Sequence, residues 1–103
     1  MYTMMQVCRE LDMTYQTLKF YCNEGLVPNV KRDHNNRRVF DEKDVKWIKD
    51  LTCLKKCGMS IQEMKKYLEL CLQGEATIVS RKKMLARKQE ELRASIKELE
   101  DSI

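Results

Sequence analysis

In the first 25 residues, apolar side chains recur at the three- and four-residue spacing of two short helices. The first helix is expected over residues 4–11, where Thr3 followed by Gln6 forms a capping box. The second is expected over residues 15–23, with Gly25 placed where a helix ends in the left-handed conformation. Two short helices joined by such a turn predict a helix-turn-helix unit.

The second helix of such a unit usually enters the major groove of DNA. Its outward side carries a phenol, an amide and an ammonium group, from Tyr15, Gln16 and Lys19. Leu18 and Tyr21 share the apolar face, and Tyr21 is also included among the candidate DNA contacts. Gln16 is expected to address a base edge, because Gln pairs bidentately with adenine.

A basic hairpin is predicted directly after this unit. Short strand-like pieces at residues 30–32 and 38–40 flank the polar turn 33–36. The eight residues from 31 to 38 contain four cations, Lys31, Arg32, Arg37 and Arg38. A basic hairpin in this position is typical of a winged helix, whose wing lies along the DNA backbone. His34 lies in the turn and is expected to contact phosphate or to stay at the surface.

Two longer helices follow the hairpin. The first is expected to begin after Asp41, a good N-cap residue, and to end at Gly58. The second begins at a capping box formed by Ser60 and Glu63 and ends near Gly74. Apolar residues line one face of each helix, which predicts that both pack into a core.

From residue 75 onward the sequence lacks Gly and Pro and is rich in Lys, Arg and Glu. Apolar residues recur every seven positions at Ile78, Leu85, Leu92 and Leu99. The complementary positions, four residues further on, hold Gln89, Ile96 and Ile103, as in the seam of a coiled coil. The expected dimer-interface residues are Ile78, Leu85, Leu92, Ile96, Leu99 and Ile103. Packing on the chain's own first domain is the alternative, but the repeat persists to the last residue between charged flanks, which favours pairing with a second copy.

These patterns predict the fold class and its division. The chain is expected to be all-α with a small β-hairpin wing. Residues 1–74 would form a winged-helix DNA-binding domain, and residues 75–103 a dimerisation helix that forms a coiled coil.

The composition limits the classes of function. A chain of 103 residues has room for one compact domain and an extension, and a domain of this size often gains stability from a partner subunit. The net charge is only +4, so the local basic cluster carries more information than the total. We expect a cytoplasmic protein without a membrane partner, because the sequence has neither a long apolar run nor a signal-peptide pattern. An enzyme is not expected, because no nucleophile–base arrangement or carboxylate pair is visible.

The sequence contains five cysteines, and an odd number in a cytosolic chain argues against a disulfide scaffold. Cys8 and Cys22 fall on apolar helix faces and are interpreted as small buried hydrophobic residues. Cys53 and Cys57 share one helix face, but two ligands without a third make a poor metal site. We therefore expect neither a metal ion nor a cofactor.

Several motifs, in this order, resemble the MerR family of bacterial transcription regulators. They are Thr17-Leu18-Lys19-Phe20-Tyr21, Gly25-Leu26-Val27-Pro28, Arg32, Arg38-Val39-Phe40 and Gly58-Met59-Ser60. The sequence departs from the family pattern where Lys19 replaces Arg, Phe20 replaces Tyr, and Asn36-Arg37 replaces Gly-Tyr. Lys lacks the bidentate geometry of Arg, so Lys19 is expected to make a simple phosphate contact.

The resemblance implies a mechanism of promoter distortion. A homodimer joined by an antiparallel coiled coil binds a palindromic promoter whose two elements are too far apart for RNA polymerase. The dimer bends and untwists the spacer, so that both elements face the polymerase holoenzyme. In this scheme Arg38 anchors the wing to phosphate, and the turn at residues 58–60 approaches DNA as a second wing. A purely structural helix hairpin is an equally good interpretation of that turn from the sequence.

Residues 52–60 and 67–74 resemble a short branch of the family without an effector-binding domain, and we expect no such domain after the dimer helix. Members of this branch respond to reactive aldehydes or nitrosative stress through one cysteine, which matches Cys53. A thiolate is the nucleophile in such chemistry, and lysines at positions 49, 55 and 56 lie close by in sequence. The hypothesis is a sensor of electrophile or oxidative stress; the alternative is an inert, buried thiol.

Two other functions are consistent with parts of the pattern. An architectural winged-helix protein of the excisionase type also binds DNA through a hairpin and a helix, although many such proteins lack a long dimer helix. A helical interaction module without DNA contacts would leave the cations of residues 31–38 in solvent. A salt-titrated DNA-binding measurement separates the second alternative from the others.

Overall fold

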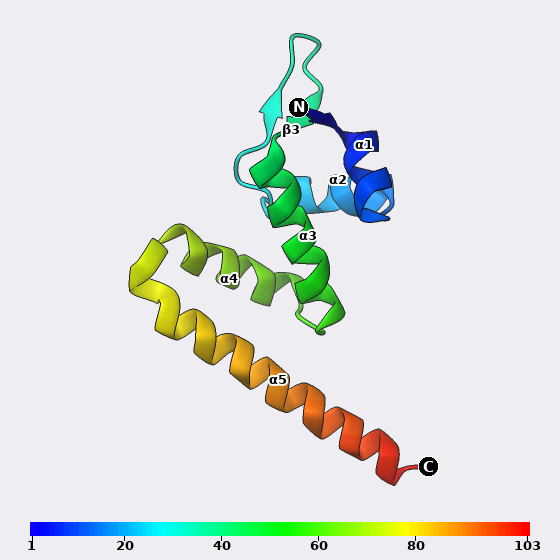
Figure 1. Cartoon of the computed structure of the whole chain (residues 1–103), viewed down its shortest axis with the longest axis vertical. Helices are drawn as coiled ribbons and strands as arrows, with labels where there is room; N and C mark the ends of the chain where they lie inside the picture. The colour runs from blue at the N-terminus through cyan, green and yellow to red at the C-terminus, as the bar shows by residue number, and fades with distance from the viewer. The chain divides into compact units, whose positions relative to one another are not determined.

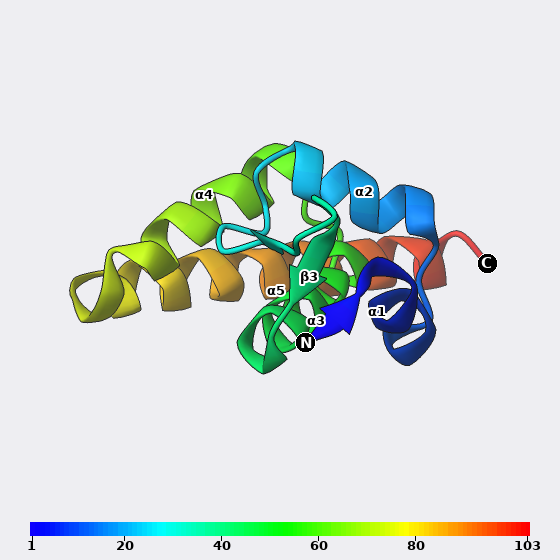
Figure 2. The same cartoon turned by 90° about the horizontal axis from the view of Figure 1, so that it is seen from above.

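The computed structural model describes residues Met1–Ile103, which divide into two compact units, Met1–Thr52 and Cys53–Ile103. Helices form most of the chain, and a small antiparallel sheet lies in the first unit (Figures 1 and 2). The predicted fold class is confirmed. The boundary between the two units falls after Thr52, within the third helix. The division predicted at residue 74 separates a DNA-binding domain from a dimerisation helix, and it stays a prediction.

The helix-turn-helix forms at the predicted positions. Helix α1, Met4–Leu11, begins with the expected capping box, in which the Gln6 N–H donates to Thr3 Oγ1 at 3.2 Å and the Thr3 N–H donates to Gln6 Oε1 at 2.8 Å. The helix ends at Asp12, which takes the left-handed conformation with a φ of 51°. Helix α2, Tyr15–Asn23, follows after this short break.

The sheet has three short strands rather than the two of the predicted hairpin. Strands β2, Lys31–Arg32, and β3, Arg38–Phe40, form the hairpin, and β1, Tyr2–Thr3, pairs with the other edge of β3. All pairs are antiparallel, with Tyr2 opposite Phe40. Strand β1 was not predicted, because a two-residue strand shows no alternation of apolar and polar positions.

The core of the first unit lies between the two short helices, the sheet and the start of helix α3. The side chains that are almost fully buried are Val7, Leu18, Tyr21, Leu26, Phe40, Ile48 and Leu51. Trp47 fastens the loop after α2 to this core, because its indole N–H donates to the Leu26 carbonyl oxygen at 2.6 Å. Burial of each large apolar side chain contributes on the order of 1.5–3 kcal/mol, so this unit has a core of its own.

Helix α3, Glu42–Lys56, runs from the first unit into the second. Its beginning is fixed by a reciprocal pair, since the Asp44 N–H donates to Asp41 Oδ1 at 2.8 Å and the Asp41 N–H donates to Asp44 Oδ2 at 3.0 Å. The prediction that Asp41 caps this helix is confirmed. Gly58 follows the helix with a φ of 85°, a backbone conformation that residues other than glycine rarely adopt.

The second unit contains helix α4, Ile61–Leu72, a turn of 3-10 helix, Gly74–Thr77, and helix α5, Ile78–Asp101. Helices α4 and α5 lie side by side (Figures 1 and 2). Leu54, Met59, Met64 and Leu68 form a small core, whereas no residue of α5 is buried. None of the helices has both the length and the apolar character needed to cross a lipid bilayer.

Candidate nucleic-acid interface

Helix α2 has one polar side and one apolar side. Thr14 caps the helix, accepting a hydrogen bond from the Thr17 N–H at 3.1 Å. Tyr15, Gln16 and Lys19 are exposed, as the sequence predicted, and Tyr15 and Gln16 lie in the first turn of the helix. This is the part of a recognition helix that reaches base edges, so the side chains have the right position for contacts in the major groove.

Tyr21 does not belong to this polar side. Its side chain is only 1% exposed, and its buried hydroxyl has no hydrogen-bond partner. Burial raises the pKa of the Tyr21 phenol above its ordinary value. The expectation that Tyr21 contacts DNA is therefore wrong for this structure, because the residue lies three positions after Leu18 and shares its inward direction.

The turn of the wing is built around Asp33. The Asp33 carboxylate accepts hydrogen bonds from the N–H groups of Asn35 and Arg37, each at 2.9 Å. Asn36 adopts a left-handed conformation with a φ of 61°, which asparagine tolerates better than most residues. An asparagine at this position, where glycine is common in the resembled family, is thus compatible with the turn. The fold of the turn leaves His34 exposed at the tip.

Two arginines of the wing hold defined positions. The Arg32 guanidinium donates to the Asn36 carbonyl oxygen at 3.0 Å, across the turn. The Arg38 guanidinium donates to Asn23 Oδ1 at 2.7 Å, which ties β3 to the end of α2. The sequence did not identify Asn23 as a functional residue, because its partner lies fifteen positions away and no local pattern links the two.

A hollow of about 510 Å³ lies where the wing, the start of α1 and the start of α2 face one another. Its walls include Tyr15 and three of the predicted wing cations, Arg32, Arg37 and Arg38. Guanidinium groups bind phosphate through charge-assisted hydrogen bonds, and a phenol adds a further donor. The structure therefore brings four of the predicted DNA contacts around one space that suits a backbone phosphate, while Gln16, Lys19 and His34 are exposed elsewhere on the same unit.

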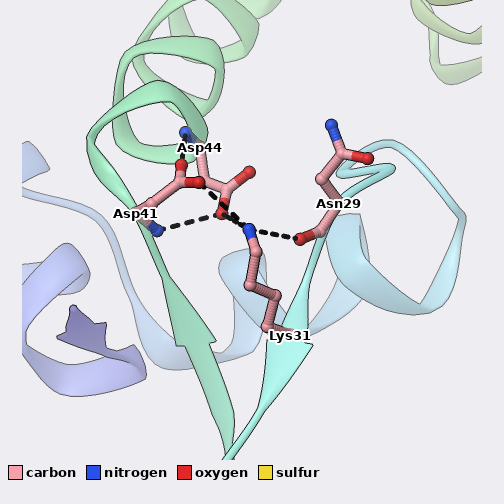
Figure 3. A network of polar contacts seen from close by, with 4 residues as sticks. All are labelled: Asn29, Lys31, Asp41 and Asp44. Atoms are coloured by element: carbon pink, nitrogen blue, oxygen red, sulfur yellow. Dashed lines mark hydrogen bonds and ion pairs between the residues drawn. The ribbon is translucent and has the colours of Figure 1, made fainter.

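Lys31, counted with the wing cations in the sequence, points away from them. Figure 3 shows its ammonium group between Asn29, Asp41 and Asp44 at the base of the hairpin. Lys31 Nζ lies 3.0 Å from Asp41 Oδ2 and 3.8 Å from Asp44 Oδ2. The Asp44 N–H and then Lys31 hold the pKa of the Asp41 carboxyl well below its ordinary value, at about 2. Lys31 thus anchors the hairpin to the start of α3 and does not line the hollow.

The five thiols differ in exposure. Cys8 is buried, Cys22 and Cys71 are half-buried, and Cys53 and Cys57 are exposed. Burial raises the pKa of the Cys8 and Cys22 thiols, which lowers their thiolate fraction at neutral pH. The interpretation of Cys8 as a small buried hydrophobic residue is confirmed, whereas the alternative that Cys53 is a buried core residue is wrong. No group of three or more His, Cys, Asp or Glu side chains is close enough to hold a metal ion.

The predicted seam of α5 forms an apolar stripe that is largely exposed. Leu92 is half-buried, and the exposed members on the helix are Ile78, Leu85, Ile96 and Leu99. Ile103 is also exposed, but it follows the end of α5 at Asp101. Leu85 and Leu92 also line a groove of about 570 Å³, together with Cys57 and Met59. A soluble helix rarely leaves such a stripe open to water, so this surface suits a partner helix.

Residues 2–71 match the model of the MerR helix-turn-helix regulatory proteins, and residues 45–103 match a second model described as MerR, DNA binding. The chain is 36% identical over 98 residues to an uncharacterized helix-turn-helix-type transcriptional regulator of Haemophilus influenzae, covering 95% of this chain and 73% of that protein. It is 37% identical over 87 residues to the transcriptional regulator AdhR of Bacillus subtilis, covering 84% of this chain and 62% of AdhR.

A solved structure has the same arrangement of elements. It is the crystal structure of HiNmlR, described as a MerR family regulator lacking the sensor domain and bound to promoter DNA. The TM-score is 0.85 at 35% sequence identity, and the match covers 98% of this chain and 76% of HiNmlR.

Proposed function

This chain belongs to the MerR family of DNA-binding transcriptional regulators, and on that basis we propose that it acts as a homodimer on a palindromic promoter in the cytoplasm. Its role is regulatory rather than catalytic. The observation that carries the proposal is the hollow bordered by Tyr15, Arg32, Arg37 and Arg38, beside the exposed first turn of the recognition helix. This hollow takes a phosphate, while Gln16 addresses a base.

The exposed stripe of α5 supports the dimer. Pairing two such stripes in antiparallel orientation buries apolar side chains that a single chain leaves in water. The two-fold symmetry of the dimer then requires two half-sites of opposite orientation, which is why the operator is a palindrome.

The dimer acts by distorting the promoter spacer, so that RNA polymerase holoenzyme engages both promoter elements. Bending a DNA site of about 20–30 base pairs costs on the order of 1–6 kcal/mol. Contacts of the two wings with the DNA backbone supply the compensating interactions. The promoter-bound structure of HiNmlR, which is similar over nearly this whole chain, supports a promoter as the target.

The test uses the DNA upstream of this protein's own gene as the probe. Affinity is measured against a random duplex of equal length across a salt series, and bending is followed by energy transfer between dyes on the two DNA ends. In vitro transcription with RNA polymerase holoenzyme then compares the promoter with and without the protein. Specific binding with bending and a change in transcript level is expected. Bending without any change in transcription would point to the architectural alternative, and weak binding that is equal on both duplexes would contradict the proposal.

Cys53 is the thiol proposed to sense electrophiles. Its exposure supports this role, and Cys57, one turn away and also exposed, is the proposed resolving thiol. A small aldehyde or thiol probe should label Cys53 faster than Cys8 and Cys22 in the folded protein, because a buried thiol is both shielded and less ionised. Cys53→Ala should bind the promoter normally but lose the response to aldehyde, while Cys71→Ala serves as the matched control. A response that survives in Cys53→Ala would remove this thiol from the mechanism.

A further inference from the structure

Lys88, in the middle of α5, is unusually withdrawn from solvent for a lysine. Its side chain is only 13% exposed. The ammonium group lies 2.9 Å from Glu91 Oε2, one turn along the same helix, and 3.2 Å from Glu63 Oε2 on α4. The second contact crosses between two helices, so it restrains their relative position in a way that the first does not.

Glu63 also lies in the first turn of α4, where it forms the capping box with Ser60 directly after the turn between α3 and α4. Its Oε1 accepts a hydrogen bond from the Ser60 N–H at 2.9 Å, and its own N–H donates to Ser60 Oγ at 3.1 Å. The Ser60 N–H, followed by Lys88, holds the pKa of the Glu63 carboxyl below its ordinary value, which is the sign expected for a carboxylate that is stabilised in its charged form. A continuous polar path therefore runs from Lys88 through Glu63 to Ser60.

Lys88 also lies next to the proposed dimer seam. It precedes Gln89, a seam position, and it lines the groove that contains Leu85 and Leu92. On its other side it borders a second hollow of about 440 Å³ between α4 and α5. A partner helix that docks on the seam would therefore press against the same stretch of α5 from which Lys88 reaches α4.

We propose that Lys88 is a positioning residue, which couples the dimer helix α5 to the turn at residues 58–60 and holds that turn where it contacts DNA. The proposal rests on the proposed function and on the approach of this turn to DNA, which the family resemblance implies. The match of residues 45–103 to the model described as MerR, DNA binding, supports that approach. It adds the link by which dimerisation sets the position of the turn.

The opposite end of the helix pair has its own restraint. The Arg81 guanidinium donates to the Gly74 carbonyl oxygen at 3.1 Å and to Thr77 Oγ1 at 3.2 Å, where α4 passes into α5. Loss of Lys88 therefore removes a restraint at the start of α4, while Arg81 still holds the junction where α4 passes into α5. A variant at Lys88 should for this reason still fold and dimerise.

The experiment compares Lys88→Gln with Lys88→Arg, which keeps the charge, and with Lys97→Gln, which removes an exposed lysine from the same helix. Dimer association is measured by sedimentation, and promoter affinity and bending by the dye-labelled duplex. Lys88→Gln should dimerise like the wild type, but it should bind the promoter about tenfold more weakly, which corresponds to about 1.4 kcal/mol, and bend it less. Lys88→Arg should restore most of both properties, and Lys97→Gln should match the wild type.

A double-mutant cycle identifies the partner. Glu63→Gln keeps an oxygen that accepts from Ser60 but loses the charge that faces Lys88, so its effect on DNA should not add to that of Lys88→Gln. Glu91→Gln should have a smaller effect, because that pair lies within one helix. The proposal is overturned if Lys88→Gln behaves like Lys97→Gln, if it loses dimerisation in proportion to DNA binding, or if its effect adds fully to that of Glu63→Gln. A wild-type protein that fails to bind the promoter would instead overturn the proposed function.

Discussion

The two compact units of this chain bury their apolar residues to different degrees. The first unit encloses Leu18, Tyr21 and Phe40 in a core, and its loops are tied to that core by Trp47. The second has a smaller core, and Ile96 and Leu99 on α5 remain 55% and 68% exposed. The first unit therefore has a buried core of its own, whereas the apolar surface left exposed on α5 supports the proposed association with a second copy.

Charges on the α5 stripe should have the largest effect. Ile96→Glu with Leu99→Glu places two carboxylates in the proposed seam, where burial of unpaired charges is strongly unfavourable. We expect a monomer that loses operator binding while the first unit stays folded, as measured by sedimentation, fluorescence of Trp47 and DNA binding. Ala94→Glu with Lys97→Glu adds carboxylates to the same helix outside the seam and should still dimerise. A double mutant at Ile96 and Leu99 that sediments as a dimer would place the interface elsewhere.

Removal of the wing cations tests the surface of the first unit and should have the next largest effect on DNA binding. Arg32→Ala and Arg38→Ala should each weaken binding to specific and random DNA alike. Each should reduce the slope of log affinity against log salt by about one unit, because the variant neutralises one phosphate fewer and its binding releases about one counterion fewer. Lys46→Ala is the matched control, since it removes an exposed cation of α3 that does not line the hollow. Wild-type affinity in the Arg32, Arg38 double mutant would contradict the assignment of the wing.

Gln16 should affect specificity more than affinity. If its amide pairs with an adenine, Gln16→Ala should lose about 1–3 kcal/mol of discrimination at one base pair. Binding of the variant to operators that differ at single positions measures this loss, and random DNA provides the reference. Equal loss on operator and random DNA would show that Gln16 contacts only the backbone.

The smallest expected effect concerns the base of the hairpin at low pH. The pKa of Asp41 is held at about 2, below its ordinary value of 3.8, so its contribution to stability is complete above about pH 4 and is lost as the pH falls toward 2. Asp41→Asn keeps a good helix cap but should flatten the dependence of the melting temperature on pH in this range. Asp50→Asn, on an exposed part of the same helix, should keep the wild-type profile. A profile of Asp41→Asn that follows the wild type would exclude this carboxylate as the titrating group.

Local signals predicted the helices well, because capping boxes and left-handed end residues are fixed by chemistry within a few positions. The bounds of α2 and the caps at Thr3, Asp41 and Ser60 were all visible in the sequence. The direction of individual side chains was harder to predict. Tyr21 is among the predicted DNA contacts, although its spacing from Leu18 already places it on the inward face.

The wing shows the same limit. Lys31 and Arg32 are neighbours on one strand, so their side chains point to opposite sides, and a count of cations cannot separate them. Contacts between distant segments, such as that of Asn23 with Arg38 or of Lys88 with Glu63, depend on the packing of whole elements and leave no periodic signal. The thiols illustrate a related point, because the exposure of Cys53 follows from which face of α3 is covered.

The anchoring of Lys31 to Asp41 and Asp44 has a consequence for the thermodynamics of DNA recognition. A hairpin that is fixed at its base, with its turn organised by Asp33, is ordered before it meets the phosphate backbone proposed as its target. Ordering a flexible segment costs roughly 1–2 kcal/mol of conformational entropy for each residue, and a preformed wing avoids most of that cost at the moment of binding. Encounter with DNA should therefore need little rearrangement of the hairpin, so association can be fast and steered mainly by charge.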